Sequence, residues 1–321
     1  MTNQHKSIGG YFELELPQGT EYHSQAIALN TGRNALEYIL RARGYKRVYL
    51  PYYSCEVLLE PFKRLGIEYA FYHINANLEA DLQPSLNSDE AILCINYFGL
   101  KQDHVNALAQ RYGKQLIVDN TQAFYAQPID GIDTFYSCRK FFGVPDGAYL
   151  YCDKVLDAEL EQDYSWERMT HLLKRIDVSA ETAYADFREQ GEKLKNNPIR
   201  KMSNLTHRIM ASIDYDGVAG RRRQNYQLLD EAIGNKNGIA LPLSADAVPM
   251  VYPFLTTDQQ LRQRLIDNKV YIATYWPNVL DWCNTDSTEY TLTTQLLPLP
   301  IDQRYGKEEM NTIIKVIAEW I

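Results

Sequence analysis

Short apolar segments alternate with helical segments from about residue 25 to 153, and this alternation restricts the fold more than any other feature. Residues 33–43 place apolar side chains at helical spacing and are followed by Gly44, a common residue after a helix C-terminus. Further helices are expected at 55–65 and 105–112. The short apolar runs typical of buried strands are 47–50, 69–74, 91–97, 115–118, 134–137 and 148–152. This order predicts an α/β fold with a mostly parallel mixed sheet.

The second half of the chain has a different character. Residues 155–235 are charged and helical in period. At the C-terminal end, the sequence predicts a strand at 250–255, a helix at 259–267, strands at 270–274 and 295–298, and a helix at 308–320. We therefore expect a large α/β domain over 1–235 that includes the helical segment 155–235, and a small C-terminal α+β domain over 236–321.

Charge and composition exclude several classes of protein. The net charge of −8 argues against nucleic-acid binding, and the basic run Arg221–Arg223 is interpreted as a solvated helix face or a subunit contact. No apolar run is long enough to span a membrane. The five cysteines form no CxxC pair, which predicts free, mostly buried thiols and a cytoplasmic protein. The histidines lack ligand spacing, so no metal site is expected.

Lys140 lies in a turn rich in glycine and proline, directly after the strand predicted at 134–137. A lysine at a strand end can reach a ligand in the crevice of an α/β sheet, where its amine can bond covalently to a carbonyl carbon. Ser137 and Arg139 could bind a phosphate nearby. A lysine in a surface loop is the commoner case, so this motif alone does not define a site.

Two other segments have the same ambiguity. Asp119 ends an apolar strand and could pair with a protonated pyridine nitrogen, or it could cap the next turn. Thr31 and Gly32 open a helix whose N-terminus could bind an anion, or Thr31 could serve as an ordinary N-cap. The three segments in this order are more specific than any one of them.

Together these motifs resemble the DegT/StrS family of aminotransferases, which depend on pyridoxal 5'-phosphate (PLP) and include sugar aminotransferases. The resemblance extends over nearly the whole chain. Residues 30–36 stand where the family has Gly-Thr-x-Ala-Leu, and residues 119–123 match its Asp-x-x-Gln-Ala. The remaining matches are 51–55, 96–99, the lysine loop from Lys140 to residues 146–148, and 297–300.

The resemblance implies the PLP-dependent transferase fold type I and a role for each matching residue. Lys140 would bind the cofactor covalently and transfer protons, Asp119 would contact the ring nitrogen, and Gln122 the ring face or phenolate side. Phosphate would be bound by Thr31, Gly32 and Ser137, and Arg33 could bind phosphate or a substrate anion. Cys55 stands at the position of the family's stacking aromatic, for which Tyr53 could substitute, while Asn96 begins the strand-end motif. A homodimer is implied, with Asn204 as the candidate phosphate ligand from the neighbouring subunit.

The expected reaction is amino transfer from a donor such as glutamate to a keto acceptor, such as a nucleotide-linked keto-sugar. The alternatives are a PLP protein with another reaction or a regulatory role, and a scaffold without ligand. Ser137-x-x-Lys140 also matches the serine nucleophile of penicillin-binding proteins, but the Ser-Asp-Asn and Lys-Thr-Gly elements of that class do not occur.

Overall fold

The computed structural model describes residues 8–81 and 84–319. Within these ranges the main sheet has seven strands in the order β1-β7-β6-β5-β4-β2-β3. The strands are β1 (Ile27–Leu29), β2 (Arg47–Pro51), β3 (Glu68–Tyr72), β4 (Glu90–Ile95), β5 (Leu116–Asp119), β6 (Asp133–Ser137) and β7 (Ala148–Tyr151). Neighbours from β3 to β6 pair in parallel, whereas β7 pairs antiparallel with both β6 and β1. The predicted mostly parallel mixed sheet is confirmed.

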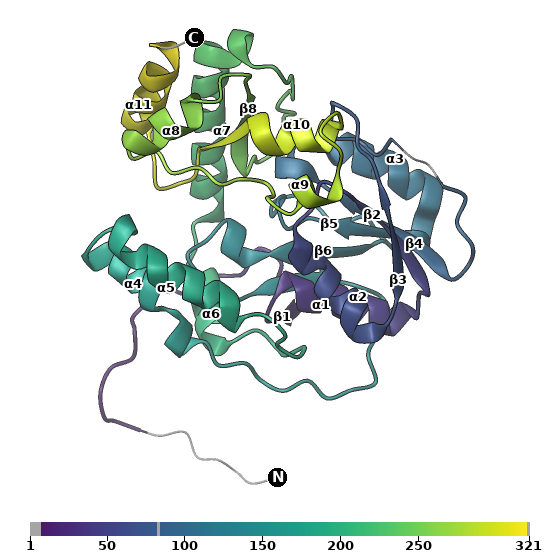
Figure 1. Cartoon of the computed structure of the whole chain (residues 1–321). Helices are drawn as coiled ribbons and strands as arrows, with labels where there is room; N and C mark the ends of the chain where they lie inside the picture. Colours follow the sequence, from purple (N-terminus) through teal and green to yellow (C-terminus); the bar gives the residue numbers. More distant parts are fainter. Residues whose placement is uncertain (1–7, 82–83, 320–321) are drawn as a thin grey trace.

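Helices cover both faces of this sheet (Figure 1). In the view shown, α1 (Gly32–Arg43) and α2 (Glu60–Leu65) lie below the sheet, and α3 (Gln102–Tyr112) lies above it. Every residue of β4 is buried, because both of its faces are covered. The helix expected over 55–65 begins instead as a 3₁₀ turn, Glu56–Leu59, and becomes α-helical at Glu60. Pro61 suits this helix start because it has no N–H to satisfy there.

The helical segment predicted over 155–235 contains α4 (Thr170–Asp177), α5 (Ala180–Lys193), α6 (Asn204–Met210) and α7 (Tyr215–Ile233). Helix α7 connects two hydrophobic clusters. Ala219 packs into the cluster under the main sheet, whereas Leu229 and Ile233 pack into a second cluster around the strands β8 (Val251–Leu255) and β9 (Leu296–Pro300). The domain boundary near residue 235 stays a prediction.

The C-terminal part contains α8 (Leu261–Asp267), α9 (Val279–Trp282), α10 (Thr288–Gln295) and α11 (Lys307–Ala318) besides β8 and β9, which pair antiparallel. The strand expected at 270–274 is wrong, because these residues pair with no strand. Arg262 Nη1 instead donates to the carbonyl of Ala273 at 2.9 Å. The last helix was expected to reach Trp320, which lies outside the described residues.

The interpretation of Arg221–Arg223 as a solvated face is wrong for its central member. Arg222 is only 2% exposed, because helix α7 turns this position toward the interior between the two clusters. Cys55, Cys94, Cys138, Cys152 and Cys283 are free thiols, of which Cys94 and Cys138 are fully buried. In the part of the chain that the structure describes, no helix is long and apolar enough to cross a membrane.

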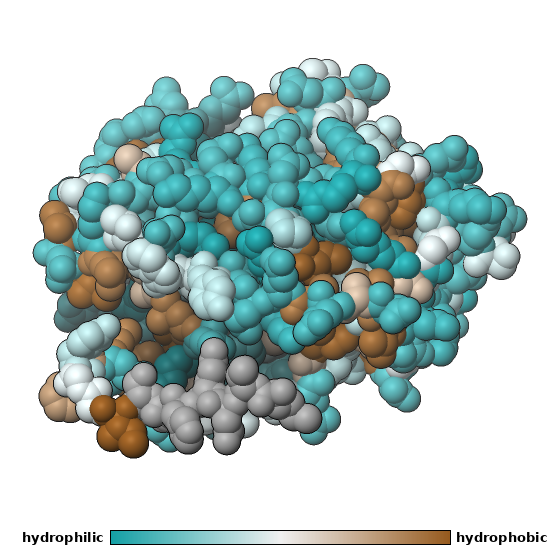
Figure 2. Space-filling model, turned by 90° about the horizontal axis from the view of Figure 1, so that it is seen from below, coloured by the Kyte–Doolittle hydropathy of each residue, from teal (hydrophilic) through white to brown (hydrophobic). Residues whose placement is uncertain are grey.

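Exposed apolar side chains concentrate on α4, α5 and the N-terminal segment. They include Ile8, Tyr11, Phe12, Leu14, Leu173, Ile176, Val178, Tyr184 and Phe187. The space-filling view from below shows separate hydrophobic groups among hydrophilic residues on this face (Figure 2). Surfaces of this kind often take part in contacts between proteins.

Candidate active site

A cavity of about 210 Å³ lies at the carboxyl ends of the parallel strands, where α/β sheets usually bind ligands. Ile95 at the end of β4, Asp119 at the end of β5 and Ser137 at the end of β6 all line it. The complete lining is Thr31, Gly32, Arg33, Ser54, Cys55, Val57, Leu58, Ile95, Asp119, Thr121, Gln122, Phe135, Ser137, Arg139, Lys140, Gly147, Leu194 and Trp276.

Asp119 is the buried carboxylate of this cavity, with 6% of its surface exposed. Its side chain accepts a hydrogen bond from the backbone N–H of Thr121 at 2.8 Å. Burial raises the pKa of Asp119, while the hydrogen bonds from Thr121 and the charge of Lys140 oppose this increase. The carboxylate therefore lies within the electrostatic reach of Lys140 and would be stabilised by a further positive group.

Lys140 ends a 3₁₀ turn, Cys138–Lys140, that follows β6 directly. We call residues 137–141 the lysine turn. Its start is fixed by a hydrogen bond from the Cys138 N–H to the Gly147 carbonyl at 3.1 Å. Among the described residues, no hydrogen bond or ion pair engages the Lys140 amine, which is exposed toward the cavity. The amine is thus free to react with a ligand.

The N-terminus of α1 forms another wall of the cavity. Thr31 is its N-cap and accepts from the Asn34 N–H at 3.2 Å. A Cβ on Gly32 would lie 3.3 Å from the Thr121 side chain, so glycine permits a close approach of helix and loop. Free N–H groups at this helix start favour an anion. Arg33 is already paired with Glu60 at 2.6 Å.

Arg139 differs from Arg33, because it has no hydrogen-bond or ion-pair partner in the described part of the chain. No ion pair or hydrogen bond to its guanidinium occurs in the described ranges, although the side chain lines the cavity and is partly buried. Burial lowers the pKa of Arg139 to about 10, and the nearby charge of Arg33 adds to this effect. A cation in this situation is suited to bind an anionic ligand.

Eight of the residues expected from the sequence line the cavity together. They are Thr31, Gly32, Arg33, Cys55, Asp119, Gln122, Ser137 and Lys140. The Gln122 side chain is fixed, because its Oε1 accepts from the Phe98 N–H at 2.9 Å.

Three expected residues lie elsewhere. Tyr53 is fully buried behind the wall and packs edge-on against Trp276 at 5.0 Å between ring centroids. Asn96 accepts from the Lys101 N–H and donates to Gln102, so it fixes the start of α3. Asn204 is exposed at the first turn of α6, away from the cavity lining.

Four lining residues were not expected from the sequence: Trp276, Leu194, Thr121 and Phe135. Thr121 and Phe135 lie beside motif residues, and this proximity in the sequence could have indicated them. Trp276 comes from the C-terminal part of the chain and Leu194 from the end of α5, and no local pattern links either residue to the strand ends.

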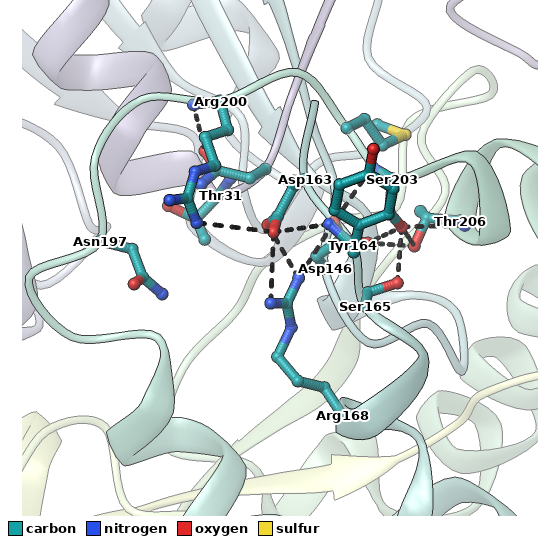
Figure 3. A network of polar contacts seen from close by, with 12 residues as sticks. Thr31, Asp146, Asp163, Tyr164, Ser165, Arg168, Asn197, Arg200, Ser203 and Thr206 are labelled. Carbon is teal, nitrogen blue, oxygen red and sulfur yellow. Dashed lines mark hydrogen bonds and ion pairs between the residues drawn. The ribbon is translucent and has the colours of Figure 1, made fainter. Parts of the chain in front are cut away.

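A network of polar contacts holds Asp146, which belongs to the lysine loop (Figure 3). Asp146 is fully buried and accepts from the Ser203 N–H at 3.2 Å, from the Ser203 hydroxyl at 2.9 Å and from the Thr206 hydroxyl. Arg168 lies 3.5 Å from Asp146 and 2.8 Å from Asp163. These contacts connect the loop next to Gly147 with the N-terminus of α6.

Comparison with family models and with curated proteins finds no match to this sequence. Solved structures do match. The sugar aminotransferase CalS13 from Micromonospora echinospora has a TM-score of 0.64 at 14% identity, covering 93% of this chain and 88% of that one. A DegT DnrJ EryC1 StrS aminotransferase from Brucella abortus has a TM-score of 0.61 at 17% identity, over 92% of this chain and 85% of that one.

A third similar structure has a title that names a different reaction. It is GDP-4-keto-6-deoxymannose-3-dehydratase (ColD) with bound GDP-perosamine, with a TM-score of 0.62 at 16% identity, over 91% of this chain and 88% of that one. The chain therefore has the fold of the DegT/StrS-type aminotransferases, PLP-dependent transferase fold type I, as the resemblance predicted. Because this fold carries more than one activity, function must be argued from the site.

Proposed function

We propose that this chain binds PLP in the cavity and transfers an amino group from an amino acid, glutamate, to a keto acceptor, a nucleotide-linked keto-sugar. The observation that carries the proposal is that the free amine of Lys140 and the buried carboxylate of Asp119 line one cavity beside the N-terminus of α1.

The cavity residues fit the chemical groups of this cofactor. Three groups suit the phosphate dianion: the Arg139 guanidinium, which is unpaired among the described residues, the Ser137 hydroxyl, and the start of α1 at Thr31 and Gly32. Asp119 suits a protonated ring nitrogen. Burial disfavours the charged carboxylate of Asp119, and a cationic partner would stabilise this charged form. Trp276 lines the cavity and offers an aromatic wall where Cys55 has none.

When bound, PLP supplies an electron sink for the chemistry at an amino acid's α-carbon. The residues of this chain orient it and move protons. The Lys140 Nζ has no competing partner within residues 8–81 and 84–319, so it can bond to a carbonyl carbon and accept or return a proton. Gln122 is held by Phe98 and presents a fixed amide to the cavity.

The proposed acceptor class draws support from the similar structures. CalS13 is titled a sugar aminotransferase, and ColD carries a bound GDP-sugar. PLP and pyridoxamine-phosphate forms of another aminotransferase also have this fold, from Streptococcus pneumoniae, with TM-scores of 0.63 and 0.62. We extend these properties to this chain as part of the proposal.

We also propose a cytoplasmic homodimer. Four exposed apolar side chains on α4 and α5 and Val178 between these helices, together with the exposed N-terminal segment, provide the kind of surface that subunits bury. Asn204 is exposed on α6 and could reach a partner's cavity. Light scattering of the purified protein at twice the monomer mass would support the dimer, and the mass of one chain would refute it.

An absorbance spectrum tests the main proposal. The wild-type protein incubated with PLP should show a visible band that shifts when glutamate is added, and Lys140→Ala should lose it. Lys114→Ala is the matched control, because Lys114 pairs with Asp153 outside the cavity and should keep the band. If the wild type shows no band in excess PLP, the proposal is wrong.

A second candidate function is another PLP-dependent reaction on a sugar, such as dehydration. The specific observation is the likeness to ColD, whose title names a dehydratase. A band that is lost in Lys140→Ala but is not converted by any amino donor would favour this alternative over amino transfer.

A further inference from the structure

The carbonyl oxygen of Phe141, the residue after Lys140, is bound by two side chains from outside the main sheet. Gln303 Nε2 donates to it at 2.7 Å, and Arg222 Nη2 donates at 3.4 Å. The Arg222 guanidinium also lies over the Phe141 ring, 4.4 Å from its centroid. Arg222 belongs to α7 and Gln303 follows β9, so the end of the lysine turn is anchored both to α7 and to the C-terminal part of the chain.

Arg222 is a buried cation that is satisfied by carbonyl groups. Its Nη1 donates to the carbonyls of Pro249 at 3.3 Å and Met250 at 2.9 Å, and its Nε donates to Gln303 Oε1 at 3.2 Å. No carboxylate of the described ranges forms an ion pair with it. Burial of such a cation is costly unless its donors are used, and the planar fork of arginine allows several carbonyls to be bound at once.

The hydrogen bonds continue from Arg222 to another residue that lines the cavity. The Met250 N–H donates to the Phe98 carbonyl at 2.9 Å, and the Phe98 N–H donates to Gln122 Oε1 at 2.9 Å. Gln122 lines the same cavity as Lys140. An unbroken chain of contacts therefore runs from the peptide after Lys140, through Arg222 and residue 250, to Gln122.

We infer that Arg222 is a positioning residue that fixes the Lys140 amine relative to Gln122 and Asp119. The sheet fixes only the start of the lysine turn, through Ser137 and Cys138. Its end depends on Arg222 and Gln303. The consequence for catalysis rests on the proposed function, in which Lys140 transfers protons. Proton transfer requires accurate placement of the Lys140 amine, and a displacement of about 1 Å can lower the rate by about 10²-fold.

Four variants separate this role from simple stabilisation. Arg222→Met removes all the donors and keeps an apolar stem, and Gln303→Met removes the other donor to Phe141 without deleting a charge. Arg222→Lys keeps the charge, but one ammonium cannot reproduce the forked contacts. Arg223→Met is the matched control, because Arg223 donates to the carbonyls of Ala247 at 2.9 Å and Asp246 at 3.2 Å but not to Phe141.

In the PLP-loaded enzyme, Arg222→Met and Gln303→Met should lower kcat by about tenfold or more with the donor KM changed less than about threefold. Both should also move the pH midpoint of the visible band, which reports the environment of the lysine-bound cofactor. Arg222→Lys should not restore either value, and Arg223→Met should match the wild type. The inference is overturned if Arg222→Met and Gln303→Met keep the wild-type kcat and pH midpoint and differ from it only in Tm.

A measurement without cofactor distinguishes failure of this inference from failure of the proposed function. The Phe142 N–H donates to the Cys138 carbonyl at 3.0 Å and closes the lysine turn. Its hydrogen exchange should become about tenfold faster in Arg222→Met and in Gln303→Met, but not in Arg223→Met. Unchanged exchange would refute the anchor itself. If exchange is faster in both variants but the wild-type protein never binds PLP, the anchor stands and the proposed function is refuted.

Discussion

The lysine turn has an open side and a packed side, and one aspartate and one arginine from each side can be compared. On the open side, Asp119 and Arg139 line the cavity, and the guanidinium of Arg139 has no partner in the described ranges. On the packed side, Asp146 accepts from Ser203 and Thr206, and Arg222 donates to several carbonyls. Burial lowers the pKa of both arginines to about 10, so burial alone does not distinguish them.

The difference lies in whether the polar groups are satisfied within the chain. A buried polar group without a partner costs free energy, and proteins keep such groups mainly where a ligand completes them. We interpret the open side as prepared for an anion and a ring nitrogen, and the packed side as the support that fixes Lys140. Each prediction below tests one side against the other.

The largest expected effect comes from the two aspartates. Asp119→Asn should lower kcat/KM by about 10²–10³-fold, the size typical of losing one preorganised electrostatic partner. It should not lower the Tm of the cofactor-free protein, because burial raises the pKa of Asp119 and the amide avoids the cost of a buried charge.

Asp146→Asn is the matched change on the packed side. Its amide N–H₂ would replace one of the two carboxylate oxygens and would face either the Ser203 N–H or the hydroxyls of Ser203 and Thr206, which should destabilise the fold by about 1–3 kcal/mol. Urea unfolding and steady-state kinetics measure both variants. Equal losses of activity without any difference in stability would contradict the distinction between the two sides.

The next effect concerns Arg222. Arg222→Met should reduce the free energy of unfolding by about 2–3 kcal/mol, because the carbonyls of Pro249 and Met250 lose their donor while they remain buried. Arg223→Met should cost less, since the side chain of Arg223 is nearer to solvent. If Arg222→Met unfolds at the same urea concentration as the wild type, water has replaced the hydrogen bonds of Arg222 to these carbonyls.

A pH effect should arise on the packed side at His23, which lies among Phe124, Tyr136 and Tyr149. Burial lowers the pKa of His23 from 6.5 to about 4. Between these two pH values the imidazole is therefore protonated in the unfolded chain but neutral in the folded chain. Stability should therefore fall as pH drops from 6.5 to about 4, by up to about 3 kcal/mol from this group.

His23→Gln should flatten that slope in urea midpoints measured across the window. His207 provides a control of opposite sign. Its hydrogen bond with Glu21 raises its pKa, so its contribution is present below pH 6.5 and is lost as pH rises through the folded pKa. An unchanged slope in His23→Gln would mean that His23 is protonated in the folded chain.

The smallest expected effect belongs to Arg139 on the open side. Arg139→Met should weaken PLP binding by about tenfold, the loss of one charged hydrogen bond to phosphate, without lowering the Tm of the cofactor-free protein. Titration with PLP and with pyridoxal, which lacks the phosphate, separates the two contributions. Equal weakening for both ligands would show that Arg139 does not contact the phosphate.

Local patterns in the sequence were enough to predict the mixed sheet, most of its strands and the positions of Asp119, Ser137 and Lys140 at strand ends. These features depend on period, apolar runs and turn residues, all of which lie within a few residues of one another. The same local reasoning failed at 270–274, where an apolar run has strand character but Arg262 takes the carbonyl of Ala273.

What the sequence determined by itself is therefore the α/β class and the motifs that reach the cavity from neighbouring parts of the chain. Only the tertiary structure decided that Trp276 and Leu194 close the cavity, that Tyr53 lies behind its wall, and that Arg222 is buried against Phe141 rather than solvated. The physical reason is that the partners of these side chains lie far away in the sequence. A residue's burial and its hydrogen-bond partners are properties of the packed chain, and no local period specifies them.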